Sequence, residues 1–285
     1  MKIFKRISIV LLVLVVLMGG LFAGGYFYVK INFGIDLIQA LGQINALKTP
    51  VDESVLCSNA FSTEDMASTQ TQVNNSISGL ITNDDNEYQV DVEGVYSLMS
   101  GDISLTDKQL GALMDTLLRQ QSNGKVQING VEIDAEIKQV SFLQVSNGDV
   151  LMNCVLMVNV QPMIDQMAVK FPLSLVKGLL PSVIYINSTF IIEKNAGAFN
   201  YTVYAQELTI NNMDEQQTSE LFETINKIVS FGTVEDWNLQ IGIVFADAFI
   251  GNYEEQGFAY SLYYLGARDF SFTQIGGEIT FNILD

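Results

Sequence analysis

The chain has 285 residues, of which 32 are Asp or Glu and 14 are Lys or Arg, so its formal net charge is −18 at pH 7. This excess of negative charge repels phosphate backbones and excludes direct nucleic-acid binding. The chain contains no histidine, which excludes Ser-His-Asp triads, Cys-His pairs and zinc sites that use imidazole. The strong catalytic and cofactor motifs are missing, and the five carboxylates between Asp84 and Glu93 lack the spacing of a calcium loop. We therefore predict a non-enzymatic protein without a cofactor or metal.

The N-terminal segment predicts a membrane anchor. The 23 residues from Ile7 to Val29 carry no charge, and a helix of that length crosses the roughly 30 Å apolar core of a bilayer. Three basic residues lie within the first six positions, so the positive-inside rule places the N-terminus in the cytoplasm. Residues 1–30 are predicted to be a cytoplasmic basic flank and a transmembrane helix. The protein would then be a single-pass protein of the cell membrane, with residues 31–285 outside.

A cleaved signal peptide is the alternative for the same segment. Ile7 to Met18 could form its apolar centre, and Ala23-Gly24-Gly25 offers small residues at a cleavage site. We favour retention, because the aromatic residues from Tyr26 to Tyr28 prolong the apolar run and suit a membrane–water interface. Beyond residue 30 the chain then carries 10 basic and 32 acidic residues, and 10 − 32 gives −22.

Residues 31–86 predict a stalk followed by a polar lead-in segment. Apolar residues at helical spacing indicate that the stalk is a helix between Phe33 and Leu47, which ends before Pro50: Leu37, Ile38, Leu41 and Ile44. Residues 51–86 are rich in Ser, Thr, Asn and Gln. We expect this second part to be loosely packed.

Residues 87–285 predict one extracytoplasmic α+β domain. A capping box at Thr106 to Gln109 begins the first amphipathic helix. Long antiparallel strands follow at 131–137, 140–145 and 150–160, with a tight turn at Asn147-Gly148. A second pair of strands, 183–192 and 199–210, is joined at Asn195-Ala-Gly197. Two further helices begin at Asp214 and Thr233. Strands are expected at 258–265, 269–273 and 278–284, and a turn at Gly276-Gly277 joins the last two. The fold class is therefore a long twisted antiparallel sheet packed with about three amphipathic helices.

Two further features concern buried side chains. Cys57 and Cys154 are too few for a disulfide framework, and we favour two free or buried thiols over one bridge. Methionines and other apolar residues crowd around three prolines between Met152 and Ile186. They form either ordinary core or the wall of a lipid-sized groove. The residues that would line such a groove, together with the first helix, are Met163, Met167, Phe171, Leu175, Leu179, Leu110, Leu113 and Leu117.

The order of elements resembles that of the small bacterial TULIP-like (tubular lipid-binding) domains, in which a long helix lies in a curved antiparallel sheet. The residues that carry this resemblance are Ile103-Ser-Leu-Thr-Asp-Lys-Gln-Leu110 and the strand meander after them. It implies binding of an apolar ligand or a scaffolding role at the membrane, without catalysis.

The leading functional hypothesis is a membrane-tethered domain that binds a lipid or another apolar ligand. The alternative is an envelope scaffold that docks on another membrane or cell-wall protein through its acidic surface or its stalk. An enzyme that uses carboxylates alone ranks third, because the commonest general base is missing.

Overall fold

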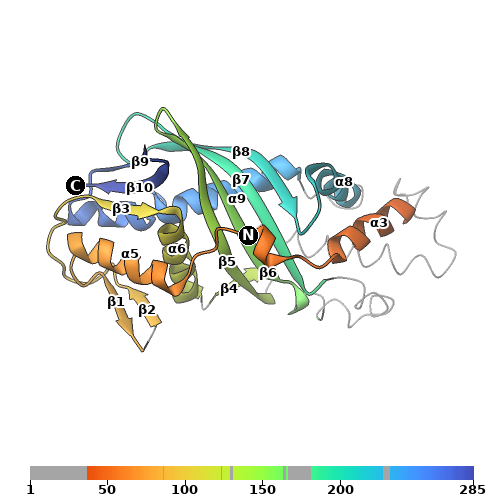
Figure 1. Ribbon diagram of the computed structural model, residues 1–285, viewed down its shortest axis with the longest axis horizontal. Coiled ribbons are helices and arrows are strands. Elements are labelled where there is room, and N and C mark those ends of the chain that lie inside the picture. The colour runs from red at the N-terminus through yellow and green to blue at the C-terminus, as the bar shows by residue number, and fades with distance from the viewer. Residues whose placement is uncertain are drawn as a thin grey trace.

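Antiparallel sheets and the helices packed on them make up the described chain, which confirms the predicted α+β class (Figure 1). The computed structural model describes residues 37–85, 87–122, 124–128, 131–162, 165, 181–226 and 232–285. Its helices are α3 (Leu37–Lys48), α4 (Glu53–Leu56), α5 (Thr63–Ser76), α6 (Asp107–Ser122), α8 (Glu215–Asn226), α9 (Val234–Phe249), α10 (Phe258–Ser261) and the 3₁₀ helix η4 (Leu262–Leu265). None of these helices has the length and apolar character that a membrane crossing requires. The predicted span, residues 7–29, lies outside the described residues.

The larger sheet has five strands in the order β4-β5-β6-β7-β8. They are β4 (Lys125–Ile128), β5 (Val131–Ser146), β6 (Asp149–Asn159), β7 (Val183–Lys194) and β8 (Tyr201–Ile210). The predicted turn at Asn147-Gly148 is confirmed, since both residues have positive φ, 57° and 93°, as a type I′ turn requires. The predicted pairing of β7 with β8 is also confirmed. The segments 131–137 and 140–145 form the single strand β5, whose pairing register shifts between them.

Helices α6 and α9 pack on one face of this sheet, and both begin at predicted caps. Thr106 and Gln109 exchange the two hydrogen bonds of a capping box at the start of α6, and Thr233 caps α9 in the same way. Gly242 allows α9 to approach the sheet closely, because a Cβ at this position would lie 2.9 Å from the Phe190 side chain. The apolar side chains between helices and strands form one continuous core.

The lead-in segment, residues 51–86, packs more tightly than predicted. Val73 of α5 and the following Ile77 are fully buried in the main core. The Thr69 hydroxyl donates a hydrogen bond to the backbone carbonyl of Gln109 in α6. The prediction of loose packing was therefore wrong, because several apolar residues of this polar segment are buried against α6 and the neighbouring strands.

The predicted stalk helix is confirmed from Leu37 to Lys48, and its end is attached to the domain. Ile44 and Leu47 are buried. The side-chain amide of Asn211, just after β8, donates to the backbone carbonyl of Leu47 at 2.6 Å. The end of α3 is therefore a fixed part of the fold.

The segment 258–265 was predicted as a strand, and this prediction was wrong. It forms α10 and η4 instead. Its buried residues, Phe258, Ala259 and Leu262, fall at positions 0, 1 and 4, which is the spacing of one helix face. Tyr260 between them is partly buried against the core, and Tyr263 and Tyr264 after them are exposed.

The smaller sheet has the strand order β3-β10-β9 and lies at one end of the molecule, together with the C-terminus (Figure 1). Its strands are β3 (Ile103–Thr106), β9 (Asp269–Ile275) and β10 (Glu278–Leu284), and a separate hairpin consists of β1 (Ile81–Asp84) and β2 (Glu87–Val90). The predicted turn at Gly276-Gly277 is confirmed by the positive φ of both residues. Four buried phenylalanines pack together between this sheet and the end of α9: Phe249, Phe270, Phe272 and Phe281.

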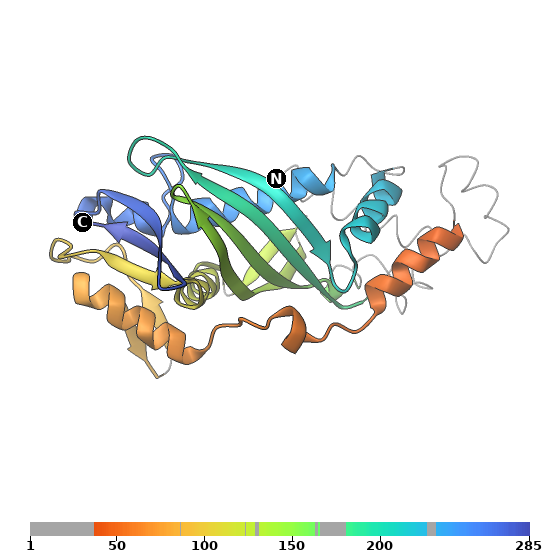
Figure 2. The same ribbon diagram turned by 45° about the horizontal axis from the view of Figure 1, so that its top comes forward.

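A strap, residues 49–61, runs across the other face of the larger sheet from α3 to α5 (Figure 2). The backbone N–H of Asn59 donates to the Gln139 side chain of β5 at 2.8 Å. Cys57 of the strap is buried, and Cys154 is buried in β6. Neither forms a disulfide, which confirms the prediction of two free thiols.

Candidate functional site

The predicted ligand-lining residues on α6 belong to the closed core. Leu110 and Leu113 are fully buried, and Leu117 packs against the same cluster. Side chains therefore fill the space between these residues and the sheet. The other five predicted lining residues lie outside the described residues: Met163, Met167, Phe171, Leu175 and Leu179.

One open hollow of about 430 Å³ lies between β8, α8 and α9. Three carboxylates line it, those of Glu207, Glu215 and Glu235. Burial and the neighbouring Glu215 raise the pKa of Glu207. The lining is strongly acidic and has no basic residue, so the hollow does not fit an anionic headgroup.

A second hollow, of about 350 Å³, lies where the strap meets β5. Lys138 is the basic residue in its lining, and its ammonium lies 3.1 Å from Glu136 and 3.9 Å from Glu53. Burial, and then the charge of Glu53, raise the pKa of the Cys57 thiol. Because a thiol with a raised pKa is a poor nucleophile, this arrangement does not activate Cys57.

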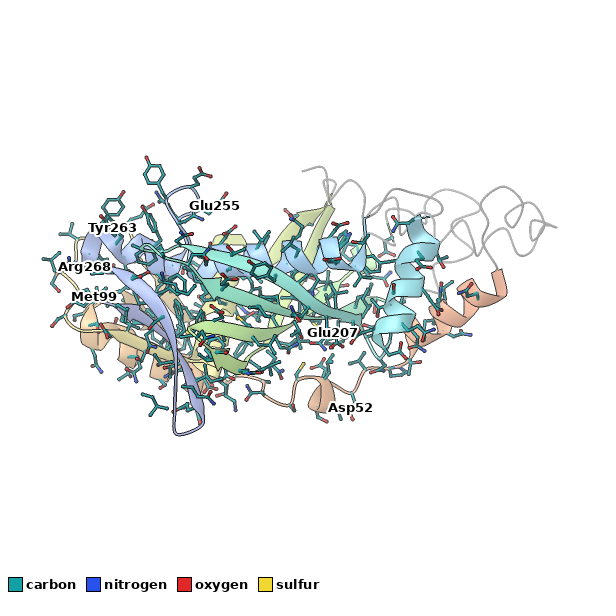
Figure 3. The ribbon with its side chains drawn as sticks, turned by 90° about the horizontal axis from the view of Figure 1, so that it is seen from above. Asp52, Met99, Glu207, Glu255, Tyr263 and Arg268 are labelled. Carbon is teal, nitrogen blue, oxygen red and sulfur yellow. The ribbon has the colours of Figure 1, made fainter. Side chains whose placement is uncertain are left out.

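The most distinctive surface of the described chain is a cluster of four tyrosines, here called the tyrosine tip: Tyr253, Tyr260, Tyr263 and Tyr264. Tyr253 is 81% exposed, Tyr264 is 71% exposed and Tyr263 is 50% exposed. Figure 3 shows Tyr263 and Glu255 at the end of the molecule opposite to α3. Exposed groups of large rings are uncommon on protein surfaces, because burying them would stabilise the protein. This surface is therefore a candidate contact site.

The rings of the tyrosine tip are ordered by contacts with one another and with the core. Tyr260 and Tyr263 stack in parallel with centroids 5.8 Å apart, and Tyr264 stands at 78° to Tyr263. Tyr260 also packs edge-on against the buried Phe199. Burial and the three neighbouring tyrosines raise the pKa of Tyr260. The tip is therefore a set of ring contacts built on a fixed base.

Two glycines make the tight loop beneath the tyrosine tip possible. At Gly257 a Cβ would lie 2.2 Å from the backbone carbonyl oxygen of Asp247, and at Gly251 it would lie 2.0 Å from the Gly257 nitrogen. Between them, the Asn252 side chain accepts hydrogen bonds from the backbone N–H groups of Glu254 and Glu255. This tight loop holds Tyr253 on the surface.

The segment before β3 adds apolar surface beside the tip. The backbone N–H of Met99 donates to the carbonyl of Leu265, the last residue of η4, at 2.6 Å. Leu98 next to it is exposed, and so is Val95. A distant part of the sequence is thus hydrogen-bonded to the end of η4, the helix that carries Tyr263 and Tyr264.

This surface was not predicted from the sequence. A signal was present, since four of the 11 tyrosines fall within residues 253–264. Only the helical path of 258–265 turns Tyr260, Tyr263 and Tyr264 to the same side, and a strand would have separated them.

The structure therefore defines an α+β domain with antiparallel sheets and an exposed aromatic surface at one end. No protein-family model matches the chain, and comparisons with curated proteins and with solved structures found no match. The resemblance to TULIP-like domains stays a prediction.

Proposed function

We propose that this protein is a non-enzymatic interaction module that docks on a protein partner through its tyrosine tip. The observation that carries the proposal is an exposed cluster of tyrosines on a rigid base. Tyrosine is enriched at the centres of protein interfaces, where it supplies a large contact area. An ordered cluster also loses little side-chain entropy on binding, because its rings are already held in place.

In this proposal the protein is tethered to the cell membrane, with residues 7–29 as the transmembrane helix and the domain outside the cell. The uncharged length of this segment and the basic residues before it support the tether. Because α3 and Tyr263 lie at opposite ends of the molecule (Figure 3), such a tether would present the tip away from the bilayer. Protease treatment of intact cells tests the orientation. We expect the domain to be digested, and a protected C-terminus would contradict it.

Site-specific photocrosslinking in the producing cells tests the docking surface. A photoreactive phenylalanine analogue at Tyr264 should give one dominant crosslinked protein. The matched control is the same analogue at Tyr204, an exposed tyrosine on β8 away from the tip. A crosslink of equal yield at both positions, or none at Tyr264, would contradict the proposal.

Binding of an apolar ligand, the leading hypothesis from the sequence, stays a prediction that rests mainly on residues 163–180. Native mass spectrometry of the full chain released from a mild detergent tests it. A lipid bound in fixed ratio would support this hypothesis. A ligand-free mass together with a Tyr264 crosslink would favour the interaction module.

A further inference from the structure

The end of the molecule that carries the tyrosine tip has a large excess of acidic residues. Between residues 247 and 285, one residue, Arg268, is basic and six are acidic: Asp247, Glu254, Glu255, Asp269, Glu278 and Asp285. Asp102 adds a further carboxylate at this end, where it accepts a hydrogen bond from the backbone N–H of Asp285. The local potential is therefore negative, and it attracts cationic groups.

Lys194 pairs with one of these carboxylates, that of Asp269. The Lys194 ammonium lies 3.1 Å from the Asp269 carboxylate. It also sits 5.0 Å from the centroid of the Phe270 ring. The Lys194 ammonium is thus already bound at the base of the tip. It is an example, in this protein, of a cation held between a carboxylate and an aromatic ring.

The outer rings offer the same combination to a partner. Tyr263 stacks on Tyr260 with one face, and Tyr264 meets Tyr263 at 78°, so the two exposed rings form a corner. Glu254 and Glu255 are exposed on the loop that carries Tyr253. A guanidinium or ammonium group is attracted to a tyrosine face and to a carboxylate at the same time.

We infer that the tyrosine tip recognises a segment of its partner protein that carries arginine or lysine side chains. This inference rests on the proposed function of the tip as a docking surface. The rings would supply contact area and cation–π attraction, and the carboxylates would select for positive charge. A neutral or acidic partner would leave Glu254 and Glu255 without a counter-charge at the interface.

Peptide binding to the full chain in a non-ionic detergent tests the inference. The probe is a fluorescein-labelled hexa-arginine peptide, and a Gly-Ser peptide of equal length is the neutral control. We expect binding of the first peptide only. The variant Tyr263→Ala/Tyr264→Ala, which leaves the net charge unchanged, should bind about fivefold more weakly, because two ring faces are lost.

Charge variants separate the tip from the overall acidity of the protein. Glu254→Gln/Glu255→Gln should also weaken binding about fivefold. Glu64→Gln/Glu223→Gln removes the same two charges from exposed positions on α5 and α8 and should change binding less than twofold. Equal weakening by both pairs, or full binding by the tyrosine variant, would overturn the inference.

The two proposals fail in different ways. If the Tyr264 crosslink forms in cells and excess hexa-arginine peptide does not reduce it in membrane preparations, docking stands and cation recognition is wrong. If no crosslink forms, the docking surface itself is wrong.

Discussion

Two aromatic layers lie at the same end of the molecule, and they differ in one oxygen atom per ring. The inner layer consists of phenylalanines buried between α9 and the smaller sheet, and the outer layer consists of the tyrosine tip. They touch through Tyr260, whose ring packs on Phe199, which in turn packs on Phe270. Phenylalanine needs no hydrogen-bond partner when buried, whereas each tyrosine hydroxyl at the surface can stay in water.

Aromatic content alone does not distinguish the core from a contact surface. The inner rings are removed from water and closely packed, and their burial stabilises the fold. The outer rings have kept much of their exposure, so their removal should affect binding more than folding. Substitutions in the two layers should therefore give opposite patterns of stability and binding.

The largest effect is expected in the inner layer. Phe281→Ala should lower the free energy of unfolding by about 3–5 kcal/mol, because a fully buried ring leaves a cavity among its neighbours. Urea unfolding of the full chain in a mild detergent measures it. Phe281→Leu, which fills most of the space, should cost less, and a loss below about 1 kcal/mol for alanine would contradict the close packing of this layer.

The close approach of Gly257 to the backbone of Asp247, beneath the tip, should give the next largest effect. Gly257→Ala places a methyl group against the Asp247 carbonyl, and such overpacking costs about 1–3 kcal/mol. Gly42→Ala is the matched control, because it lies in α3 with open space around its Cβ position. The control should raise stability by roughly 0.5–1 kcal/mol through helix propensity. Melting temperatures that shift in the same direction would contradict this account.

Tyr201 lies between the two layers and should respond in an intermediate way. Its ring packs on Phe270, and its hydroxyl donates to the carboxylate of Asp247. Tyr201→Phe keeps the packing and removes the donor, so we expect a loss of about 1 kcal/mol. Tyr204→Phe, on the same strand, removes a hydrogen bond to Glu193 at an exposed position and should cost less than Tyr201→Phe. Thermal unfolding monitored by circular dichroism compares the two variants.

The outer layer should show the smallest effect on folding. Tyr263→Ala/Tyr264→Ala should stay within about 0.5 kcal/mol of the parent, as surface substitutions usually do. The same variant should lose partner crosslinking. A melting temperature as low as that of Phe281→Ala would show that the outer rings belong to the core and would undo the comparison.

Local signals in the sequence predicted much of the fold. The caps at Thr106 and Thr233 and the turn at Asn147-Gly148 depend on a few neighbouring residues, so they could be recognised without the structure. The burial of α5 could not, because Thr69 meets Gln109 from 40 positions away. Sequence periodicity contains no information about such a distant contact.

The tyrosine tip could not be predicted from the sequence for a related reason. Nearly every residue from Phe258 to Leu265 is apolar or aromatic, so a strand and a helix fit the pattern almost equally well. Gly257 and its close contact with the backbone at Asp247 set the path of the chain. That contact joins residues on two different elements and becomes visible only in three dimensions.

The strand β8 gives the molecule a fixed span. Its last residue lies one position before Asn211, which holds the end of α3, and its first residue, Tyr201, joins the aromatic layers. Ten extended residues at roughly 3.3 Å each separate these two points by about 30 Å. Since neighbouring strands brace β8, a partner bound at the tip would be kept at a set height above α3, and the domain would serve as a spacer as well as a receptor.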